Sequence, residues 1–442
     1  MNLNRGLILS GGLFLAMNTS LLGNNFSQKI IKIYEKHHLI KMVDYDLKTS
    51  EEQVKSAKSN WYPYLTIKGS YGNDKINRKL GESGSYNPKK VSAEIKQLIY
   101  DFGITNSRIN SAEKVFEKEK HENELQRQNL LLAAVESQLE LIKSDFLYKN
   151  SLKSESNIKE QTRLENARVE MGKGYSTDVL QSKASLSGAE ANKIYAQGQK
   201  KISEYRYKAV FQNENPEIEK MNAFIIDEKK LPESLISLEK KIKANNPDLL
   251  AAKARALVSS SEKDVIKKEQ YSPNIYLDLS RSFSEEQDGV NGKRYDSKAL
   301  VTFSWGFNLG LRASDEINAA KFASLSSREK AKYVEVQALE EGRKVWNNLE
   351  VARLRTKYLK NQILIQENFL KLAREEREIG RRSLIDILNG ETSLLRTKGE
   401  FASSKIEEII SSFRVLRSIG ELNMDLFKDE SIYISQNKVF DN

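Results

Sequence analysis

A heptad spacing of apolar and small residues predicts that much of the chain forms very long helices. The spacing is clearest in the second half, at Val345, Leu349, Ala352, Thr356, Leu359, Ile363, Gln366, Leu370 and Ala373. The first half repeats it at Val135, Leu139, Ile142 and Phe146. No proline falls between Thr105 and Met171, so a helix of about 65 residues, roughly 100 Å long, fits there. Helices of this length build a rod or a tube.

Four shorter segments alternate apolar and polar residues and predict β-strands. We expect these strands at about 63–73, 89–100, 273–283 and 297–309. Loops rich in Gly, Asn, Asp and Lys join them into two hairpins. The last strand has the most regular alternation, and its outward-facing residues are Val301, Phe303, Trp305 and Phe307.

Two interpretations fit these hairpins. A small soluble sheet with one wet face would alternate in this way, and so would transmembrane strands with an apolar face toward lipid. Four strands cannot close a barrel, since about eight are needed, and open edges are not tolerated in lipid. We favour membrane strands, because Phe303, Trp305 and Phe307 share one face, and several chains must then share one barrel.

One motif occurs twice, a glycine followed six residues later by Asp, then Val or Ile, then Leu. It occupies 172–180 in the first half and 380–388 in the second. An amide follows each copy, Gln181 and Asn389. The duplicated unit is longer than a solenoid repeat, so we predict two copies of a helix–β-hairpin–long helix–turn–helix assembly.

Each motif predicts a reversal between two helices. Gly172 and Gly380 stand where a helix end favours a left-handed residue. Ser176 or Thr177, and in the second half Ser383, are candidate N-caps of the following helix.

The aspartates of the motif, Asp178 and Asp386, then fall in the first turn of that helix and favour its dipole. Capping chemistry alone would account for them. Alternatively, both reversals lie at one end of a tube, where the carboxylates ring an opening.

The predicted segments follow from these elements. They are a first repeat at 24–213, a linker at 214–235, a second repeat at 236–427 and a polar C-terminal tail at 428–442. The long helices are expected at 104–171, 176–213, 313–379 and 384–424.

The N-terminus has the pattern of a signal peptide, expected at 1–23. Arg5 precedes an apolar run that is too short to span a bilayer.

Composition argues against several classes of function. The chain has no cysteine, which excludes thiolate metal sites. Its net charge is +10, but Lys alternates with Glu along the helices as on a solvated face, so we expect no nucleic-acid partner. His37, His38 and His121 are interpreted as ordinary helix residues rather than metal ligands. No phosphate loop or nucleophile motif occurs, and we expect neither an enzyme nor a cofactor.

Taken together, these features resemble the TolC-like outer-membrane efflux protein family. The resemblance rests on the signal, the duplicated unit, the paired turns and Asn246-Pro247-Asp248-Leu249 at the start of the second half, and covers about 29–422. It implies a mainly α fold with a transmembrane β-barrel contribution, in which a homotrimer forms an α-barrel tunnel and one shared β-barrel. It also implies the outer membrane of a Gram-negative-type bacterium, a body in the periplasm, a periplasmic adaptor (membrane fusion) protein and an inner-membrane pump.

The resemblance further implies site residues. Asp386 corresponds to an aspartate that narrows the tunnel entrance, and Arg382 to a gating arginine. Asn389 stands where some members carry a second aspartate, which leaves a single acidic ring. The positions that match adaptor-docking turns are Gly172, Gly174, Gly380 and Ser383.

The expected function is a passive exit duct of a tripartite efflux or type I secretion system. The alternative is a periplasmic coiled-coil scaffold or adaptor with small soluble β modules. An adaptor has one helical hairpin and an inner-membrane tether, whereas this chain repeats its unit. We therefore favour the duct.

Overall fold

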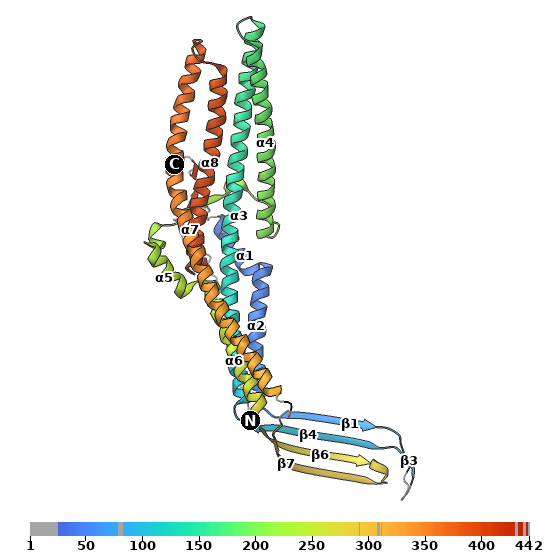
Figure 1. The fold of residues 1–442 in the computed structure, drawn as a ribbon. Coiled ribbons are helices and arrows are strands. Elements are labelled where there is room, and N and C mark those ends of the chain that lie inside the picture. The colour runs from blue at the N-terminus through green and yellow to red at the C-terminus, as the bar shows by residue number, and fades with distance from the viewer. Residues whose placement is uncertain are drawn as a thin grey trace, which may run out of the picture.

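The chain forms a long helical rod with a β-sheet projecting from one end (Figure 1). This computed structural model describes residues 25–77, 83–290, 292–306, 310, 312–428, 432–435 and 439–440. The predicted signal peptide and Phe307 lie outside the described residues.

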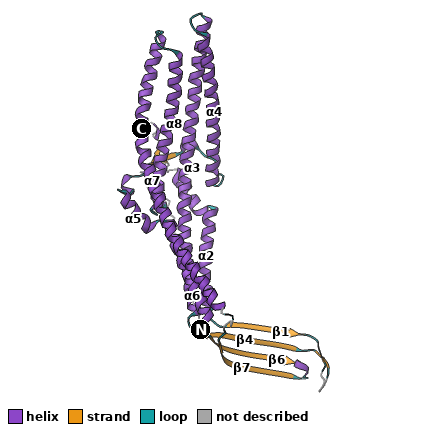
Figure 2. Cartoon of the chain, in the orientation of Figure 1, coloured by secondary structure: helices purple, strands orange, loops and turns teal. Residues whose placement is uncertain are grey.

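Two helices of 67 residues each run the length of the rod, α3 (Ile104–Glu170) and α7 (Arg312–Glu378). At about 1.5 Å per residue, each is about 100 Å long. Shorter helices pack along them: α2 (His38–Ser59) and α4 (Ser176–Val210) along α3, α6 (Pro247–Tyr271) along both, and α8 (Leu384–Ser418) along α7. The α3–α4 and α7–α8 hairpins form the end of the rod opposite the sheet (Figure 2). We call this the turn end, because it carries the turns at 171–175 and 379–383.

The heptad seam predicted in α7 is confirmed by burial. Its leucines and alanines, such as Leu349, Ala352 and Ala373, are buried against neighbouring helices. The polar members Thr356 and Gln366 are half-buried, donating to the hydroxyls of serines on α8 at 3.1 and 3.0 Å. The seam thus holds the α7–α8 hairpin together with both apolar and polar contacts.

The main hydrophobic core lies at mid-length, where short elements surround the long helices. These elements are α1 (Asn25–Lys36), α5 (Leu235–Asn245) and a two-stranded sheet of β5 (Asn222–Phe224) and β8 (Tyr433–Ser435). Phe224 is fully buried there, with its ring centroid 5.5 Å from that of Phe413 and 5.6 Å from that of Tyr433. Short 3-10 helices occupy Ile218–Lys220, Glu228–Lys230, Gln287–Gly289 and Met424–Lys428.

The expected polar tail contributes to this core. Ile432 and Val439 are buried in it, and the Tyr433 hydroxyl donates to the Phe427 carbonyl at 2.8 Å. Apolar residues scattered in a polar segment give no periodic signal, so the sequence pattern did not reveal this strand.

The helix expected to reach residue 424 ends earlier. Gly420 adopts φ +72°, and the N–H of Glu421 donates to the carbonyl of Leu416 at 2.9 Å. This is the left-handed helix stop that glycine favours, so α8 ends at Ser418. Similarly, α4 ends at Val210, since Gln212 and Asn213 have positive φ.

Polar contacts fix the short helices on the long ones. The guanidinium of Arg127 on α3 and the amide of Asn123 donate to the carboxylate of Asp44 on α2, at 2.5 and 2.8 Å. Burial raises the pKa of Asp44, but these hydrogen bonds and the Arg127 charge outweigh it, so its pKa lies below the usual value. The side chain of Asn246 caps α6 by accepting from the Leu249 N–H at 3.0 Å, and it donates to the Ser418 carbonyl at 2.8 Å.

The projecting sheet has four antiparallel strands in the order β1-β4-β6-β7. They are β1 (Tyr64–Tyr71), β4 (Lys89–Tyr100), β6 (Asn274–Glu285) and β7 (Lys293–Ser304). A small hairpin, β2 (Asp74–Ile76) and β3 (Gly84–Tyr86), connects β1 to β4 at the end of the sheet away from the rod. The strand expected at 297–309 begins earlier, because Lys293–Asp296 pair with the polar end of β6 although they lack apolar alternation. Trp305 and Gly306 lie after its end.

No helix within the described ranges has both the length and the apolar character needed to cross a bilayer.

Candidate functional site

The two glycine turns at the turn end have the same backbone geometry. Gly172 and Gly380 adopt φ +71° and +76°. The N–H of each donates three residues back, to Val169 at 2.9 Å and Arg377 at 3.0 Å, and the following N–H donates five residues back at 2.8 Å. This pair of hydrogen bonds is a Schellman motif, which confirms the predicted left-handed helix ends.

The N-cap residues that follow the two turns differ. Ser383 caps α8 as predicted, accepting from the Asp386 N–H at 3.3 Å. In the first half the predicted cap is wrong: α4 begins at Ser176 itself, and its N-cap is Tyr175, which makes no side-chain cap hydrogen bond. Both N-caps lie three residues after the glycine, and the first copy has a tyrosine at the position where the second has Ser383.

The second turn carries a charged cluster. Arg382 pairs with Glu376 at 2.8 Å and with Asp386 at 3.7 Å, and its guanidinium lies 5.4 Å from the ring centroid of Phe369. Asp386 keeps a side chain 43% exposed, and Asn389, one helical turn on, is exposed. The structure thus brings Arg382 and Asp386 together at the tip of α7–α8.

The first turn has no equivalent cluster. Asp178 lies in the first turn of α4 as expected, and Gln181 is exposed. Within the described part of the chain, Asp178 forms no ion pair. The two copies of the motif therefore share backbone geometry but differ in charge.

A buried ion pair joins the two helical hairpins just below the turns. Arg377 on α7 donates from one guanidinium nitrogen to both carboxylate oxygens of Glu165 on α3, at 2.8 and 3.0 Å. A second nitrogen donates to the Arg382 carbonyl at 3.0 Å. Glu165 is only 3% exposed, and the only other cation near it among the described residues is Arg168, at 4.0 Å.

The sequence carried a signal for this pair that our prediction missed. Glu165 follows the buried residues Ile158 and Thr162 at steps of four and three, and Arg377 follows Ala373 by four. Both charges therefore occupy seam positions. A charge at a seam position requires a partner, because an unpaired buried charge is costly.

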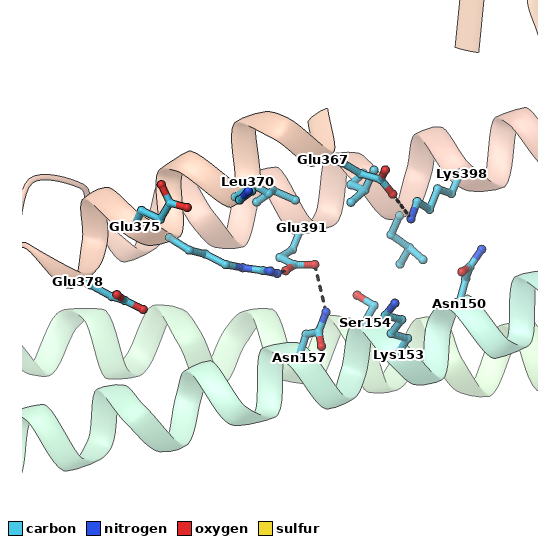
Figure 3. Close-up of a pocket in the computed structure, with 14 residues that line it drawn as sticks. Asn150, Lys153, Ser154, Asn157, Glu367, Leu370, Glu375, Glu378, Glu391 and Lys398 are labelled. Atoms are coloured by element: carbon cyan, nitrogen blue, oxygen red, sulfur yellow. Dashed lines mark hydrogen bonds and ion pairs between the residues drawn. The ribbon is translucent and has the colours of Figure 1, made fainter. Parts of the chain in front are cut away.

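A groove of about 440 Å³ opens between α3 and the α7–α8 hairpin nearby. Glu391 lies at its centre, bonded to Arg374 and to Asn157 at 3.5 Å, and Lys398 pairs with Glu367 at 2.5 Å (Figure 3). The Asn157–Glu391 contact links the two hairpins, whereas the two ion pairs lie within the α7–α8 hairpin. The groove offers charge and hydrogen bonds but no nucleophile beside a base.

No group of His, Cys, Asp and Glu in the described ranges could hold a metal ion. His37 instead caps a helix, because its Nδ1 accepts from the Leu39 N–H at 3.1 Å at the start of α2.

Comparisons with known proteins agree with this architecture. The family model described as outer membrane efflux protein matches residues 31–209 and 238–420. The chain is 24% identical to the outer membrane efflux protein BepC of Brucella suis, over 91% of this chain and 87% of that protein. It is 19% identical to the outer membrane protein TolC of Escherichia coli, covering 90% and 83%. The CmeC outer membrane channel of Campylobacter jejuni has the same fold, with a TM-score of 0.79, 16% identity and coverage of 95% and 94%.

Proposed function

The chain belongs to the outer membrane efflux protein family, and from this premise we propose that three copies form a passive duct through the outer membrane and the periplasm. A periplasmic adaptor protein would dock at the turn end, and an inner-membrane pump would supply the energy. The sheet is the main support for this proposal. Its exposed apolar face suits a lipid environment, and its unpaired edges require strands from neighbouring copies of the chain.

The strand register places most of the apolar residues of the four strands on one face. Cross-strand partners share a face, and the pairs Leu65–Ile95, Ile95–Leu279 and Leu279–Ala299 run across the sheet. Val301, the next residue after Ala299 on this face of β7, is 75% exposed. The opposite face carries mainly Lys, Glu, Asp and Ser, with Leu98, Tyr276 and Leu300 among them. Three of the four strands have 12 residues, which meets the length of about 9–11 tilted residues that crossing a bilayer needs, and β1 has 8.

Aromatic side chains mark two levels of the apolar face. Phe303 and Trp305 lie at the end near the helices, and both are more than half exposed. Phe283 and Tyr295, with ring centroids 5.1 Å apart, lie toward the loop end. From Phe303 to Tyr295 is about 26 Å along the strand, at about 3.3 Å per residue. Two aromatic levels at this spacing suit the girdles of a membrane barrel. Residues Val301, Phe303 and Trp305 are then lipid-facing.

Among the described strands, β1 and β7 each have a partner on one side only. In lipid, unpaired edges are not tolerated, so β1 of one copy would pair with β7 of the next. Three four-stranded sheets exceed the minimum of about eight strands for closure. The rods would continue this barrel as a helical tunnel, with the turn end as the periplasmic entrance.

At the entrance, Asp386 and Arg382 are proposed to narrow the opening. Asp386 is half exposed in the first turn of α8, so three copies would place a carboxylate ring there, and Asn389 would add amides but no charge. Opening requires the α7–α8 hairpin to move away from α3, which breaks the Arg377–Glu165 pair. The exposed turns at Gly172, Gly174, Gly380 and Ser383 are the proposed adaptor contacts.

Single-channel recording in planar bilayers tests the assignment of the entrance. The variant Arg382→Ala/Asp386→Ala is expected to raise conductance and lower cation preference, because it removes the cluster and the ring. The control is Lys332→Ala/Glu329→Ala, an exposed pair on α7 at 2.8 Å, and its currents should equal wild type. Unaltered currents in the Arg382/Asp386 variant would refute these roles.

A further inference from the structure

Three basic residues interrupt the apolar face of the sheet near its loop end. Lys89 begins β4, Lys293 begins β7, and Arg281 lies on β6. By register all three share the face of Phe283 and Tyr295, since Lys89 and Lys293 both pair with Glu285, and Arg281 pairs with Ala93 and Ser297.

Their levels relative to the aromatic residues differ. Lys89 and Lys293 lie one level beyond Phe283, toward the loops, whereas Arg281 lies one level before it, toward the apolar centre. Arg281 and Glu285 are four residues apart, about 13 Å along the strand. The long apolar stems of arginine and lysine lie along an apolar surface while their charged ends extend to a polar region. The three charged groups can therefore reach the same depth at the membrane interface.

The charges on this face are not balanced within the chain. The acidic residue beside the three cations on this face is Glu285, and its carboxylate lies 3.8 Å from the Lys89 ammonium. Arg281 is exposed, and the described residues provide it with no ion-pair partner. Three cations against one carboxylate leave an excess of two positive charges. An arginine that faces lipid without a protein partner is costly at depth, so its partner is expected outside the chain.

We propose that Arg281, Lys89 and Lys293 bind the phosphate groups of an anionic lipid headgroup in the outer leaflet of the membrane. The inference rests on the proposed function, which sets the loop end of the sheet at the outer surface. Guanidinium groups bind phosphate through two parallel hydrogen bonds, and lysines at the rim add point charge. The apolar residues below, such as Leu279 and Val301, would pack on the acyl chains of the same lipid.

The opposite face provides a matched control. Lys90, Arg294 and Lys298 are also basic, lie on the same strands near the loop end and point to the other face, where they pair by register with Ser284 and Ser280. A general attraction between basic protein and acidic lipid would involve both sets equally. A site built on the apolar face involves only the first.

The test measures lipid retention by native mass spectrometry on the full chain purified in detergent. The probes are bisphosphorylated lipid A, the same lipid with its phosphates removed, and inorganic phosphate as a competitor. The variants are Arg281→Gln/Lys89→Gln/Lys293→Gln and the control Lys90→Gln/Arg294→Gln/Lys298→Gln. At about fivefold per surface cation, the first variant should bind the phosphorylated lipid about a hundredfold more weakly, while the control binds as wild type.

Binding of the phosphate-free lipid should be weak and equal in all three proteins. The proposal would be overturned if both variants bound the phosphorylated lipid equally, whether as wild type or with an equal loss. Complete displacement of the lipid by millimolar inorganic phosphate would also overturn it. Planar-bilayer currents of the same preparations keep this result separate from the proposed function. A protein that conducts but shows no phosphate preference refutes the lipid site alone, whereas one that never inserts refutes both.

Discussion

Removing the Arg377 side chain should destabilise the turn end more than removing any exposed charge does. In Arg377→Met the carboxylate of Glu165 loses its hydrogen bonds at 2.8 and 3.0 Å while it stays buried. Leaving one partner of a buried pair unpaired costs about 3–5 kcal/mol. Because Arg377 is 18% exposed and Arg168 stays 4.0 Å from Glu165, we expect the lower end of this range. The free energy needed to separate α3 from α7 locally should fall by about 3 kcal/mol.

Hydrogen exchange of the full chain measures this opening free energy. A loss of 3 kcal/mol lowers the protection of amides around Glu165 about 150-fold, with little change in the mid-length core. The control is Arg163→Met, which breaks an exposed pair with Glu160 at 2.7 Å on the same helix and should cost less than about 1 kcal/mol. Glu165→Leu combined with Arg377→Met should recover most of the loss. Protection that falls less than about threefold in Arg377→Met would refute the reasoning.

Four further substitutions test the fold in thermal or denaturant unfolding. Gly420→Ala should lower the free energy of unfolding by more than about 3 kcal/mol, because its Cβ would lie 2.3 Å from a backbone carbonyl oxygen of α5. The Cβ of Gly380→Ala would meet nothing within 4 Å, so this variant should lose only about 1 kcal/mol, from its positive φ. Equal losses in the two variants would contradict this. Phe224→Ala should cost about 3–5 kcal/mol, since the ring is fully buried, and a loss below about 1 kcal/mol would argue against the packing described. Asp44→Asn should destabilise the protein at pH 7, and this deficit should shrink as pH falls below the ordinary Asp pKa of 3.8. The lowered pKa means that the Asp44–Arg127 pair stabilises the fold fully above the unfolded pKa and is lost as pH falls through the folded one, so a deficit that stays constant over the acidic range would contradict it.

Periodic features of this chain could be predicted from the sequence. The seam of α7 and the four alternating strands are regular over many residues, and each period specifies one buried face. The glycine turns could be predicted because Gly172 and Gly380 stand at helix ends, where a left-handed residue is favoured. The mainly α fold with a sheet contribution and the family followed from the order of these elements.

Features that depend on distant partners could not be located in this way. Glu165 and Arg377 occupy seam positions, but nothing local identifies them as partners across two hairpins. The strand β8 pairs with β5 from a polar tail, and β7 starts early because β6 offers it polar partners. Each of these is decided by tertiary contact rather than by local preference.

The mass of the detergent-purified protein, measured by light scattering, tests most directly whether copies complete one another's sheets. We predict an assembly of three times the 50.5 kDa chain, less any N-terminal segment removed. Substituting proline for Thr66 in β1, an edge strand whose one partner among the described strands is β4, should reduce the assembly to single chains, whereas Thr356→Ala on α7 should not. A single chain that stays monodisperse without detergent would contradict the account.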